Sequence, residues 1–382
     1  MIKKVEAFVL SHRLGESFFF SQHSYDSRTI CLVKLTMADG LSGWGEGYGP
    51  AGLVRAGIEF FTPLILDKDP MEQETLWQSM YLRSLDHARG GVLLSALSAI
   101  DIALWDLKGK ILRQPISSLL GGRKNDSIPA YATGLYFRDC EELSAHLAAE
   151  AKTYREQGFS AVKMKVGLGL ERDLENIRAV RQAVGSDIAL MIDANHAYSF
   201  REALQLSKRI EEFDIAWFEE PLSPEDYEGY QELRKRSSTP IAAGECERLR
   251  HGFLRLFSGR CVDIAQPDPC AAGGITETKK ISDLASAFGV DFVPHCWGSC
   301  IAVATSLHLL SNWDSCPGRL FPKKPILELD RTENPFRETL GSPSFVLDQG
   351  ELQVPDKPGL GIEIDEAIIQ RYAVDRFTSE ET

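Results

Sequence analysis

A chain of 382 residues is longer than one compact domain usually is, so we expect two domains. Hydrophobic residues make up 43% of the chain and charged residues 25%, as in ordinary soluble proteins with a large core. The net charge of −13 argues against binding to nucleic acid or to an anionic membrane, because both need a basic face. To bind an acidic substrate, such a protein would need a divalent metal with nearby lysines or arginines.

The eight cysteines form no close CxxC pair, and the first residues, Met-Ile-Lys-Lys-Val-Glu, lack the apolar stretch of a signal peptide. We therefore expect a cytoplasmic protein with free thiols. The longest apolar run, Val92 to Leu107, is interrupted by polar residues at helical intervals, which is typical of a buried amphipathic helix.

The chain begins with a predicted antiparallel meander. Its strands cover residues 2–10, 29–36 and 43–46, with a turn signal at Ala38-Asp39-Gly40 before the third strand. Three helices are expected next, over residues 53–64, 71–84 and 91–109. A meander followed by helices predicts an α+β domain, which we assign to residues 1–125.

Between the first two strands lies an aromatic segment, residues 15–28, that contains Phe18-Phe-Phe20, His23 and Tyr25. It is too aromatic for a plain linker. It could form a flap over a pocket or pack against a neighbouring subunit, and the sequence favours neither interpretation.

From Ala161 to His295, short apolar runs end in polar residues at nearly constant intervals. Asp193, Glu219 and Glu245 follow one another 26 residues apart, the length of one strand, one crossover helix and two short loops. This repeat predicts an α/β fold with a TIM-like (β/α) barrel over residues 126–332. The first strand would be Ile128–Thr133 and the eighth would lie within 325–330. The helices expected between the strands cover residues 141–157, 171–184, 200–213, 225–236, 249–258, 274–288 and 299–311. Residues 333–382 are expected to return to the first domain, with Gly359–Ile364 as an extended piece.

Asp193, Glu219 and Glu245 end successive strands, and the carboxyl ends of parallel barrel strands converge on one mouth. Three carboxylates gathered there would repel one another unless a cation lay between them. A single acidic residue at a strand end is more often a helix cap, but three at even spacing favour a metal site. Hard oxygen ligands indicate Mg²⁺, with Mn²⁺ as a possible substitute.

Lys163 and Lys165 lie two residues apart on one predicted strand, so both side chains point to the same side, the barrel interior. Two ammonium groups at close range are expected to lower each other's pKa, which would make one of them a base near neutral pH. Alone, this pair would be read as a solvated surface feature, but it comes one repeat before the three carboxylates.

His295 and Asp268 end the seventh and sixth predicted strands. The Asp268 carboxylate could accept a hydrogen bond from the imidazole and hold its orientation. A lone histidine is more often structural, and the adjacent aspartate favours a catalytic pair. Glu328, at the end of the eighth strand, could donate a hydrogen bond to an oxyanion or pair with a lysine.

These groups suit the removal of a proton from the carbon next to a carboxylate. The anion that forms must be stabilised by a metal and by cationic donors. Lys165 on one face and His295 on the other would act as base and acid. Racemisation, dehydration and ring opening all remain open, depending on what leaves the β-carbon.

The motifs resemble, in order and spacing, those of the enolase superfamily, in particular its mandelate racemase branch, the mandelate racemase/muconate lactonizing enzyme family. They are Lys163-Met-Lys165, Asp193-Ala-Asn195, Trp217-Phe-Glu-Glu-Pro221, Gly244-Glu245, Gln266-Pro-Asp268 and Pro294-His295. The resemblance implies a modified (β/α)7β barrel with an α+β N-terminal capping domain. It also implies that Asp193, Glu219 and Glu245 bind Mg²⁺ while Lys165 and the His295–Asp268 pair act on opposite sides.

Within that branch, the segments Tyr131–Gly134, Val293–Gly298 and Glu328–Arg337 are most similar to galactarolactone cycloisomerases. Such enzymes open an aldarolactone ring to a 3-deoxy-2-keto sugar diacid. The residues expected to contact substrate are Asn195, Glu328, His196, His23, Tyr25 and Trp297, with His196 equally well explained as a packing residue. The stretch 83–89 is also expected to touch the far end of the substrate.

Other functions remain possible on the same residues. An acid-sugar dehydratase would use the same metal, base and acid with a β-hydroxyl as leaving group, and a racemase would only exchange the proton. A catalytically silent binding protein is disfavoured, because it would have no reason to keep the whole set. We expect an acid sugar or its lactone as ligand and a homo-oligomer with the aromatic segment at its interface.

Overall fold

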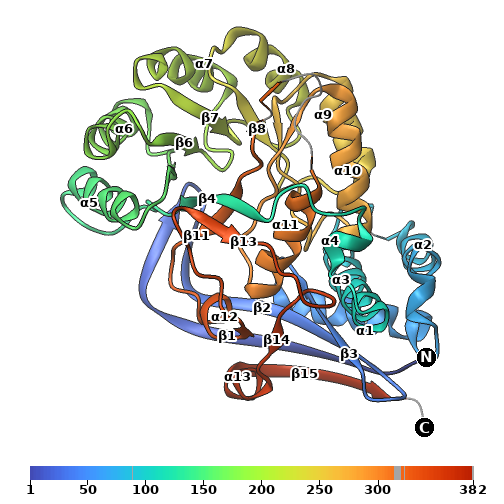
Figure 1. Ribbon diagram of the computed structural model, residues 1–382. Coiled ribbons are helices and arrows are strands. Elements are labelled where there is room, and N and C mark those ends of the chain that lie inside the picture. The colour runs from blue at the N-terminus through green and yellow to red at the C-terminus, as the bar shows by residue number, and fades with distance from the viewer. Residues whose placement is uncertain (88, 314–319, 322, 381–382) are drawn as a thin grey trace.

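The computed structural model describes the chain except residues 88, 314–319, 322, 381 and 382. Figure 1 shows a (β/α) barrel above a separate antiparallel sheet, with three helices beside that sheet. The prediction of an α/β fold with a TIM-like barrel and an α+β N-terminal domain is confirmed. No helix among the described residues is long and apolar enough to cross a membrane.

The N-terminal sheet has the strand order β15-β1-β2-β3 and is antiparallel. Its strands are β1 (Ile2–Phe20), β2 (His23–Met37), β3 (Ser42–Gly47) and β15 (Ala373–Glu380). The helices α1 (Ala51–Ile65), α2 (Gln73–Ser84) and α3 (Leu93–Leu112) pack against it around buried residues such as Val33, Phe61 and Leu97. A short 3-10 turn, η1 (Pro70–Glu72), precedes α2, and α4 (Ile116–Leu119) follows α3.

The barrel strands are parallel neighbours in the order β11-β4-β5-β6-β7-β8-β9-β10. They are β4 (Ser127–Thr133), β5 (Ala161–Lys165), β6 (Ala189–Asp193), β7 (Ile215–Glu219), β8 (Ile241–Ala243), β9 (Ile264–Ala265), β10 (Asp291–Phe292) and β11 (Leu327–Asp330). No ladder joins β10 to β11 in the part of the chain that the structure describes, so the curled sheet is open at that seam.

Helices cover the outside of the barrel (Figure 1). They are α5 (Leu143–Glu156), α6 (Leu170–Val184), α7 (Phe200–Arg209), α8 (Tyr227–Arg236), α9 (Leu249–Ser258), α10 (Gly274–Phe288) and α11 (Cys300–Asn312), with the 3-10 turn η2 (Glu211–Phe213) after α7. The strands are short apolar runs buried on both faces, whereas helices such as α6 bury one stripe, here Leu174, Ile177 and Val180.

Two buried carboxylates join the N-terminal domain to the barrel. Asp101 of α3 accepts hydrogen bonds from the Thr276 backbone N–H (2.9 Å) and hydroxyl (2.6 Å) at the start of α10. Gly274 fits there because a Cβ atom would overlap the Asp101 carboxylate. Glu46 of β3 accepts from the Ser299 N–H (3.0 Å) and hydroxyl (2.6 Å) before α11. Burial raises the pKa of both carboxyls to about 7. The domains are therefore docked through the starts of two barrel helices.

The C-terminal segment returns to the first domain later than predicted. Its main return is β15, which pairs with β1, whereas β14 (Glu363–Ile364) pairs with β12 (Gly341–Ser342). The start of the predicted piece also touches the N-terminal domain: the Gly359 carbonyl accepts from the Ile116 N–H at 3.1 Å, and the Leu360 N–H donates to Asp106 Oδ1 of α3 at 2.9 Å. The remaining elements are α12 (Pro335–Glu338), β13 (Glu351–Gln353), which pairs with β4, and α13 (Glu366–Tyr372).

Candidate active site

Three carboxylates from successive strands meet at the barrel mouth. Asp193 ends β6, Glu219 ends β7, and Glu245 follows β8 by two residues. One oxygen of each lies within 4.8 Å of the others. Asp193 and Glu219 are fully buried, whereas the Glu245 side chain is 16% exposed. Of the three carboxylates, Glu245 is therefore the one that solvent can reach.

The surroundings of the cluster fit a hard divalent cation. The Asn195 N–H donates to Asp193 Oδ1 (2.9 Å), and the side chains of Trp217 (2.9 Å) and Gln266 (2.7 Å) donate to Glu219 Oε2. These hydrogen bonds hold the two carboxylates in place, as hydrogen bonds usually do for the ligands of a bound metal ion. With three oxygen donors and no sulfur or nitrogen, the set suits Mg²⁺ or Mn²⁺ better than Zn²⁺.

Each lysine of the pair faces a carboxylate rather than only the other lysine. Lys165 Nζ donates to Asp193 Oδ2 (2.5 Å) and to Asn195 Oδ1 (2.8 Å), and Lys163 Nζ lies 2.5 Å from Glu219 Oε1. Burial would lower the pKa of each lysine, but attraction by Asp193 and Glu219 outweighs it, so both pKa values are raised. The expectation that mutual repulsion lowers these pKa values is therefore wrong for this arrangement.

His295 and Asp268 form a buried hydrogen-bonded pair. His295 Nδ1 lies 2.7 Å from Asp268 Oδ2, and His295 Nε2 lies 3.6 Å from Glu245 Oε2. Burial would lower the pKa of His295, but the charge of Glu245 and the hydrogen bond to Asp268 raise it to about 10. Asp268 is itself held by the Cys270 N–H at 2.7 Å. The imidazole is thus oriented and held in its protonated form.

Glu328, at the end of β11, is a partner of Lys163. The Lys163 Nζ lies 2.8 Å from its Oε1, and the Thr133 hydroxyl donates to the same oxygen at 2.6 Å. The backbone N–H of Cys296 donates to its other oxygen at 2.9 Å. Burial would raise the pKa of Glu328, but Lys163 and His295 lower it below its usual value, so the group is ionised. An ionised carboxylate accepts hydrogen bonds, so this arrangement favours the alternative in which Glu328 pairs with a lysine.

The aromatic segment, for which we left open a flap or a packing surface for a neighbouring subunit, is the tip of a long hairpin. Strands β1 and β2 continue to Phe20 and His23, so the segment is strand rather than loop, with an irregularity in the pairing between Arg13 and Phe18. The Ser21 hydroxyl donates to the carbonyls of Ala194 and Asn195 (both 2.9 Å), just beyond the acidic cluster. In the tip, the Phe19 N–H donates to the Phe137 carbonyl and the Phe137 N–H donates to the Phe19 carbonyl, both at 2.9 Å. The hairpin therefore closes over the barrel mouth.

A narrow cavity of about 40 Å³ lies between the hairpin and the strand ends. Its catalytic side presents Lys163, Lys165, Asn195, Glu245, His295 and Glu328. The aromatic residues that line it are Phe20 and Tyr25 of the hairpin together with Tyr48, Tyr136 and Trp297. Tyr25 and Trp297 have ring centroids 4.9 Å apart, and the Trp297 indole N–H donates to the Tyr136 hydroxyl at 2.9 Å.

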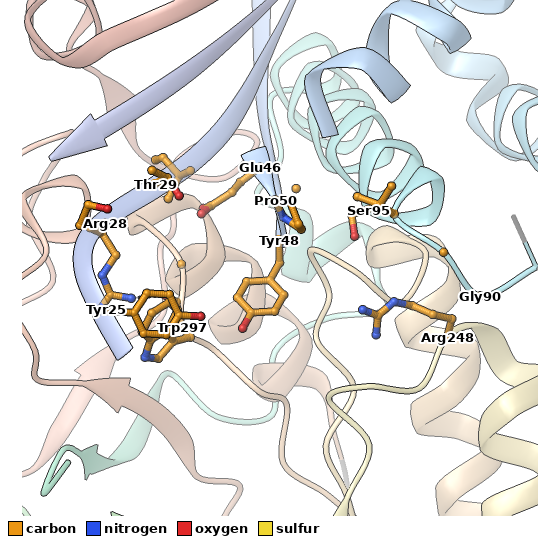
Figure 2. A pocket seen from close by; sticks show the side chains of 17 residues that line it. Tyr25, Arg28, Thr29, Glu46, Tyr48, Pro50, Gly90, Ser95, Arg248 and Trp297 are labelled. Atoms are coloured by element: carbon orange, nitrogen blue, oxygen red, sulfur yellow. Dashed lines mark hydrogen bonds between the residues drawn. The ribbon is translucent and has the colours of Figure 1, made fainter. Parts of the chain in front are cut away.

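A larger cavity of about 520 Å³ adjoins this one between the two domains. Figure 2 shows Tyr25, Trp297 and Arg28 stacked on one side of it, Tyr48 pointing into its middle and Arg248 on the opposite loop. The Arg28 guanidinium carbon lies 3.5 Å from the Trp297 ring centroid, and Arg28 is paired with Asp330 at 2.7 Å. Arg28 therefore supports the tryptophan that separates the two spaces.

Some predicted contact residues lie outside both cavities. His23 is exposed and packs against Phe20 at 5.8 Å between ring centroids, and His196 faces Glu220 and Cys246. The described residues of the stretch 83–89 do not line the larger cavity, although the adjacent Gly90 and Gly91 do.

Tyr48, Tyr136 and Arg248 line the cavities, and our sequence reasoning did not select them. Tyr136 follows the first barrel strand by three residues, so the strand-end rule could have found it. Tyr48 and Arg248 carry no comparable signal.

Two family profiles match the chain. One, described as the mandelate racemase / muconate lactonizing enzyme N-terminal domain, covers residues 4–121, and the other, enolase C-terminal domain-like, covers 146–368. A barrel of this kind, capped by this domain, defines an enolase-superfamily enzyme. Within the superfamily the chain belongs to the mandelate racemase/muconate lactonizing enzyme family, as its motifs predicted.

Several named relatives are similar over nearly their whole length. The structure of the 3,6-anhydro-D-galactonate cycloisomerase from Zobellia galactanivorans is 52% identical, with 98% of this chain and 99% of that chain covered and a TM-score of 0.89. The D-galactarolactone cycloisomerase of Agrobacterium fabrum is 41% identical, with 97% of this chain and 98% of the relative covered. The arabinonate dehydratase of Saccharolobus solfataricus is 34% identical, with 90% of each chain covered. A Streptomyces coelicolor A3(2) racemase solved with bound magnesium is 28% identical, with 98% of this chain and 100% of that chain covered and a TM-score of 0.88.

Proposed function

We propose that the chain is a Mg²⁺-dependent cycloisomerase that opens the ring of a cyclic sugar acid. The observation that carries the proposal is the arrangement of the cavity: an acidic cluster beside both Lys165 and the His295–Asp268 pair. Mg²⁺ held by Asp193, Glu219 and Glu245 would supply positive charge to the substrate carboxylate, which makes the α-proton more acidic.

The two flanking groups divide the proton transfers. With Asp193 engaged by Mg²⁺, that carboxylate would no longer hold the Lys165 ammonium group, and the neutral amine would take the proton from the α-carbon through Nζ, oriented by the 2.8 Å hydrogen bond to Asn195. The bond between the β-carbon and the ring oxygen breaks, and its electron pair leaves with the oxygen. His295 Nε2 gives that oxygen a proton, which suits a histidine whose pKa is raised to about 10. The resulting enol becomes a 2-keto acid, so no atom is gained or lost overall.

The similarity to two cycloisomerases points to two ring types. In 3,6-anhydro-D-galactonate, the ring oxygen on the carbon β to the carboxylate leaves as an alkoxide, whereas a galactarolactone releases a carboxylate. We favour the anhydro sugar acid, because the relative named for it is 52% identical and that named for the lactone 41%. An alkoxide also needs a proton donor as it leaves, and His295 is placed to be one.

The aromatic side of the cavity supports a neutral distal end of the substrate. Among the described residues that line the cavity, the cationic side chains are Lys163, Lys165 and His295, all on the catalytic side. A second carboxylate of an open-chain diacid would face Phe20, Tyr25 and Trp297, and the cation beside them, Arg28, is already paired with Asp330 at 2.7 Å. A ring with hydroxyl groups packs there with its apolar faces against the aromatic rings.

The runner-up is an acid-sugar dehydratase, which the similarity to the arabinonate dehydratase favours. To separate the two, the purified protein with Mg²⁺ is incubated with 3,6-anhydro-D-galactonate, D-galactarolactone, arabinonate and galactarate. Keto acid formation and NMR spectra are then recorded. We expect a 3-deoxy-2-keto acid from a cyclic substrate. Turnover of the open-chain acids alone would replace the proposal with the dehydratase. Exchange of the α-proton for deuterium without keto acid would indicate a racemase.

The use of Mn²⁺ in place of Mg²⁺, the assembly into a homo-oligomer and the cytoplasmic location stay predictions. So does the division of the chain at residues 125 and 332.

A further inference from the structure

A second group of possible metal ligands lies beside the acidic cluster and takes no part in the proposed reaction. His196, Glu220 and Cys246 each offer one ligand atom, and these atoms lie within 4.8 Å of one another. They come from the loops that follow β6, β7 and β8, close to the acidic cluster at the ends of the same strands. The contacts of the two groups differ. Glu219 accepts hydrogen bonds from Lys163, Trp217 and Gln266, whereas Glu220 lies against His196.

The imidazole of His196 is oriented as a metal-binding imidazole usually is. Its Nδ1 lies 3.0 Å from the carbonyl oxygen of Leu222, which can only accept a hydrogen bond, so Nδ1 carries the proton. In the neutral ring, the lone pair of Nε2 then points to Cys246 Sγ (3.5 Å) and Glu220 Oε2 (3.0 Å). A backbone carbonyl that fixes the opposite nitrogen is a recurrent feature of histidine ligands.

Glu220 has an oxygen without a hydrogen bond at this point. The residue is 1% exposed, and its Oε2 has no aligned hydrogen-bond donor among the described residues, although His196 Nε2 is close. A buried carboxylate oxygen left in this way is costly, and binding a cation is one way to satisfy it.

The group is accessible to an ion from outside. A small cavity of about 10 Å³ lies beside it and is lined by Glu220 and Cys246 but not by His196. Cys246 is an exposed free cysteine, so the group is open to solvent on the thiol side. An ion could therefore enter without unfolding the barrel mouth.

We propose that His196, Glu220 and Cys246 form a second cation site, for a borderline-soft ion of the Zn²⁺ type. The nitrogen, oxygen and sulfur donors select Zn²⁺ over Mg²⁺, whereas the three carboxylates select the reverse. Three protein ligands leave a fourth tetrahedral position for water. The ends of the same three strands and the residues just after them would thus carry two ions of different chemistry.

Cobalt(II) serves as the test probe, because cobalt bound to a thiolate absorbs in the near ultraviolet and cobalt bound to carboxylates does not. Enzyme saturated with Mg²⁺ is titrated with Co²⁺. We expect a thiolate charge-transfer band that saturates at one equivalent, is abolished by Zn²⁺ and persists in excess Mg²⁺. Cys246→Ser should lack the band, and His196→Ala should weaken Co²⁺ binding by at least about tenfold. The matched control is Cys140→Ser, at another exposed free cysteine, which should keep the band.

Absence of the band in the wild type, or its persistence in Cys246→Ser, would overturn the proposal in favour of a His196–Glu220 ion pair. A second measurement needs no variant. Alkylation of Cys246 and Cys140 by iodoacetamide is followed by mass spectrometry with and without Zn²⁺. Zn²⁺ should slow labelling of Cys246 alone, and equal rates at both cysteines would also contradict the site.

Discussion

The two sides of the cavity are built in different ways. On the barrel side, buried charged residues hold one another: Lys163, for example, contacts both Glu219 and Glu328 within 2.8 Å. On the hairpin side, Phe20 and Tyr25 are half-buried and held mainly by ring packing. Removing the partner of a buried ion strongly destabilises the protein, whereas removing an aromatic contact costs about 1 kcal/mol of stability. The barrel side is therefore suited to the reaction itself, and the hairpin side to the choice of substrate.

The largest effect should come from the barrel side. We expect Lys165→Ala to lower kcat by about 10²- to 10⁴-fold, because the variant lacks the base that we propose for the α-proton. Mg²⁺ binding and the fold should survive, since the three carboxylates remain. Steady-state kinetics and thermal unfolding measure this, with Lys152→Ala as the control at a lysine 67% exposed on α5. Full activity of Lys165→Ala would remove the lysine from the mechanism.

Acid stability offers a second comparison, between a buried histidine of the barrel, His308, and an exposed histidine of the hairpin, His23. His308 lies wholly buried in α11, with Nδ1 accepting from the Ser117 N–H at 3.3 Å and Nε2 donating to the Leu360 carbonyl at 3.1 Å. Burial lowers its pKa from 6.5 to about 4. The unfolded chain therefore binds this proton first, and stability is lost as the pH falls from about 6.5 to 4.

The expected loss from His308 is about 3 kcal/mol in the free energy of unfolding. Denaturant unfolding of the wild type and of His308→Gln at pH 7 and pH 4 measures it, since the glutamine has no charge to gain. His23→Gln is the control, because that side chain is exposed on the hairpin. If His23→Gln changes the pH dependence as much as His308→Gln does, burial is not the cause.

The smallest effect should come from the hairpin side. We expect Tyr25→Ala to lower kcat/KM for the cyclic substrate by about tenfold through loss of its packing on Trp297 and Phe20. Thermal stability should hardly change, and relative activity on open-chain acids should rise. Ser24→Ala, at the neighbouring exposed position, is the control. A drop in kcat as large as that of Lys165→Ala would abolish the distinction between the two sides.

The same contrast explains what the sequence could predict. The barrel and its acidic residues follow from a repeat length and from the rule that strand ends converge, so Asp193, Glu219 and Glu245 could be selected together. The lysine pKa could not be predicted, because it depends on which carboxylate each ammonium group faces. For the hairpin tip, the sequence left a flap and a subunit contact equally open, since aromatic residues in a long strand carry no pattern that identifies their partners. Tyr48 was missed because only packing brings it to His295, with ring centroids 5.2 Å apart.

The central claim is that one divalent ion is shared by Asp193, Glu219 and Glu245 at the mouth of the barrel. A crystal structure of the protein grown with Mg²⁺ tests it most directly. We predict a single ion with an oxygen of each of the three side chains at about 2.0–2.1 Å, and Lys165 and His295 on opposite sides of it. Three carboxylates that point apart, or that keep only the lysines as partners at saturating Mg²⁺, would contradict the account.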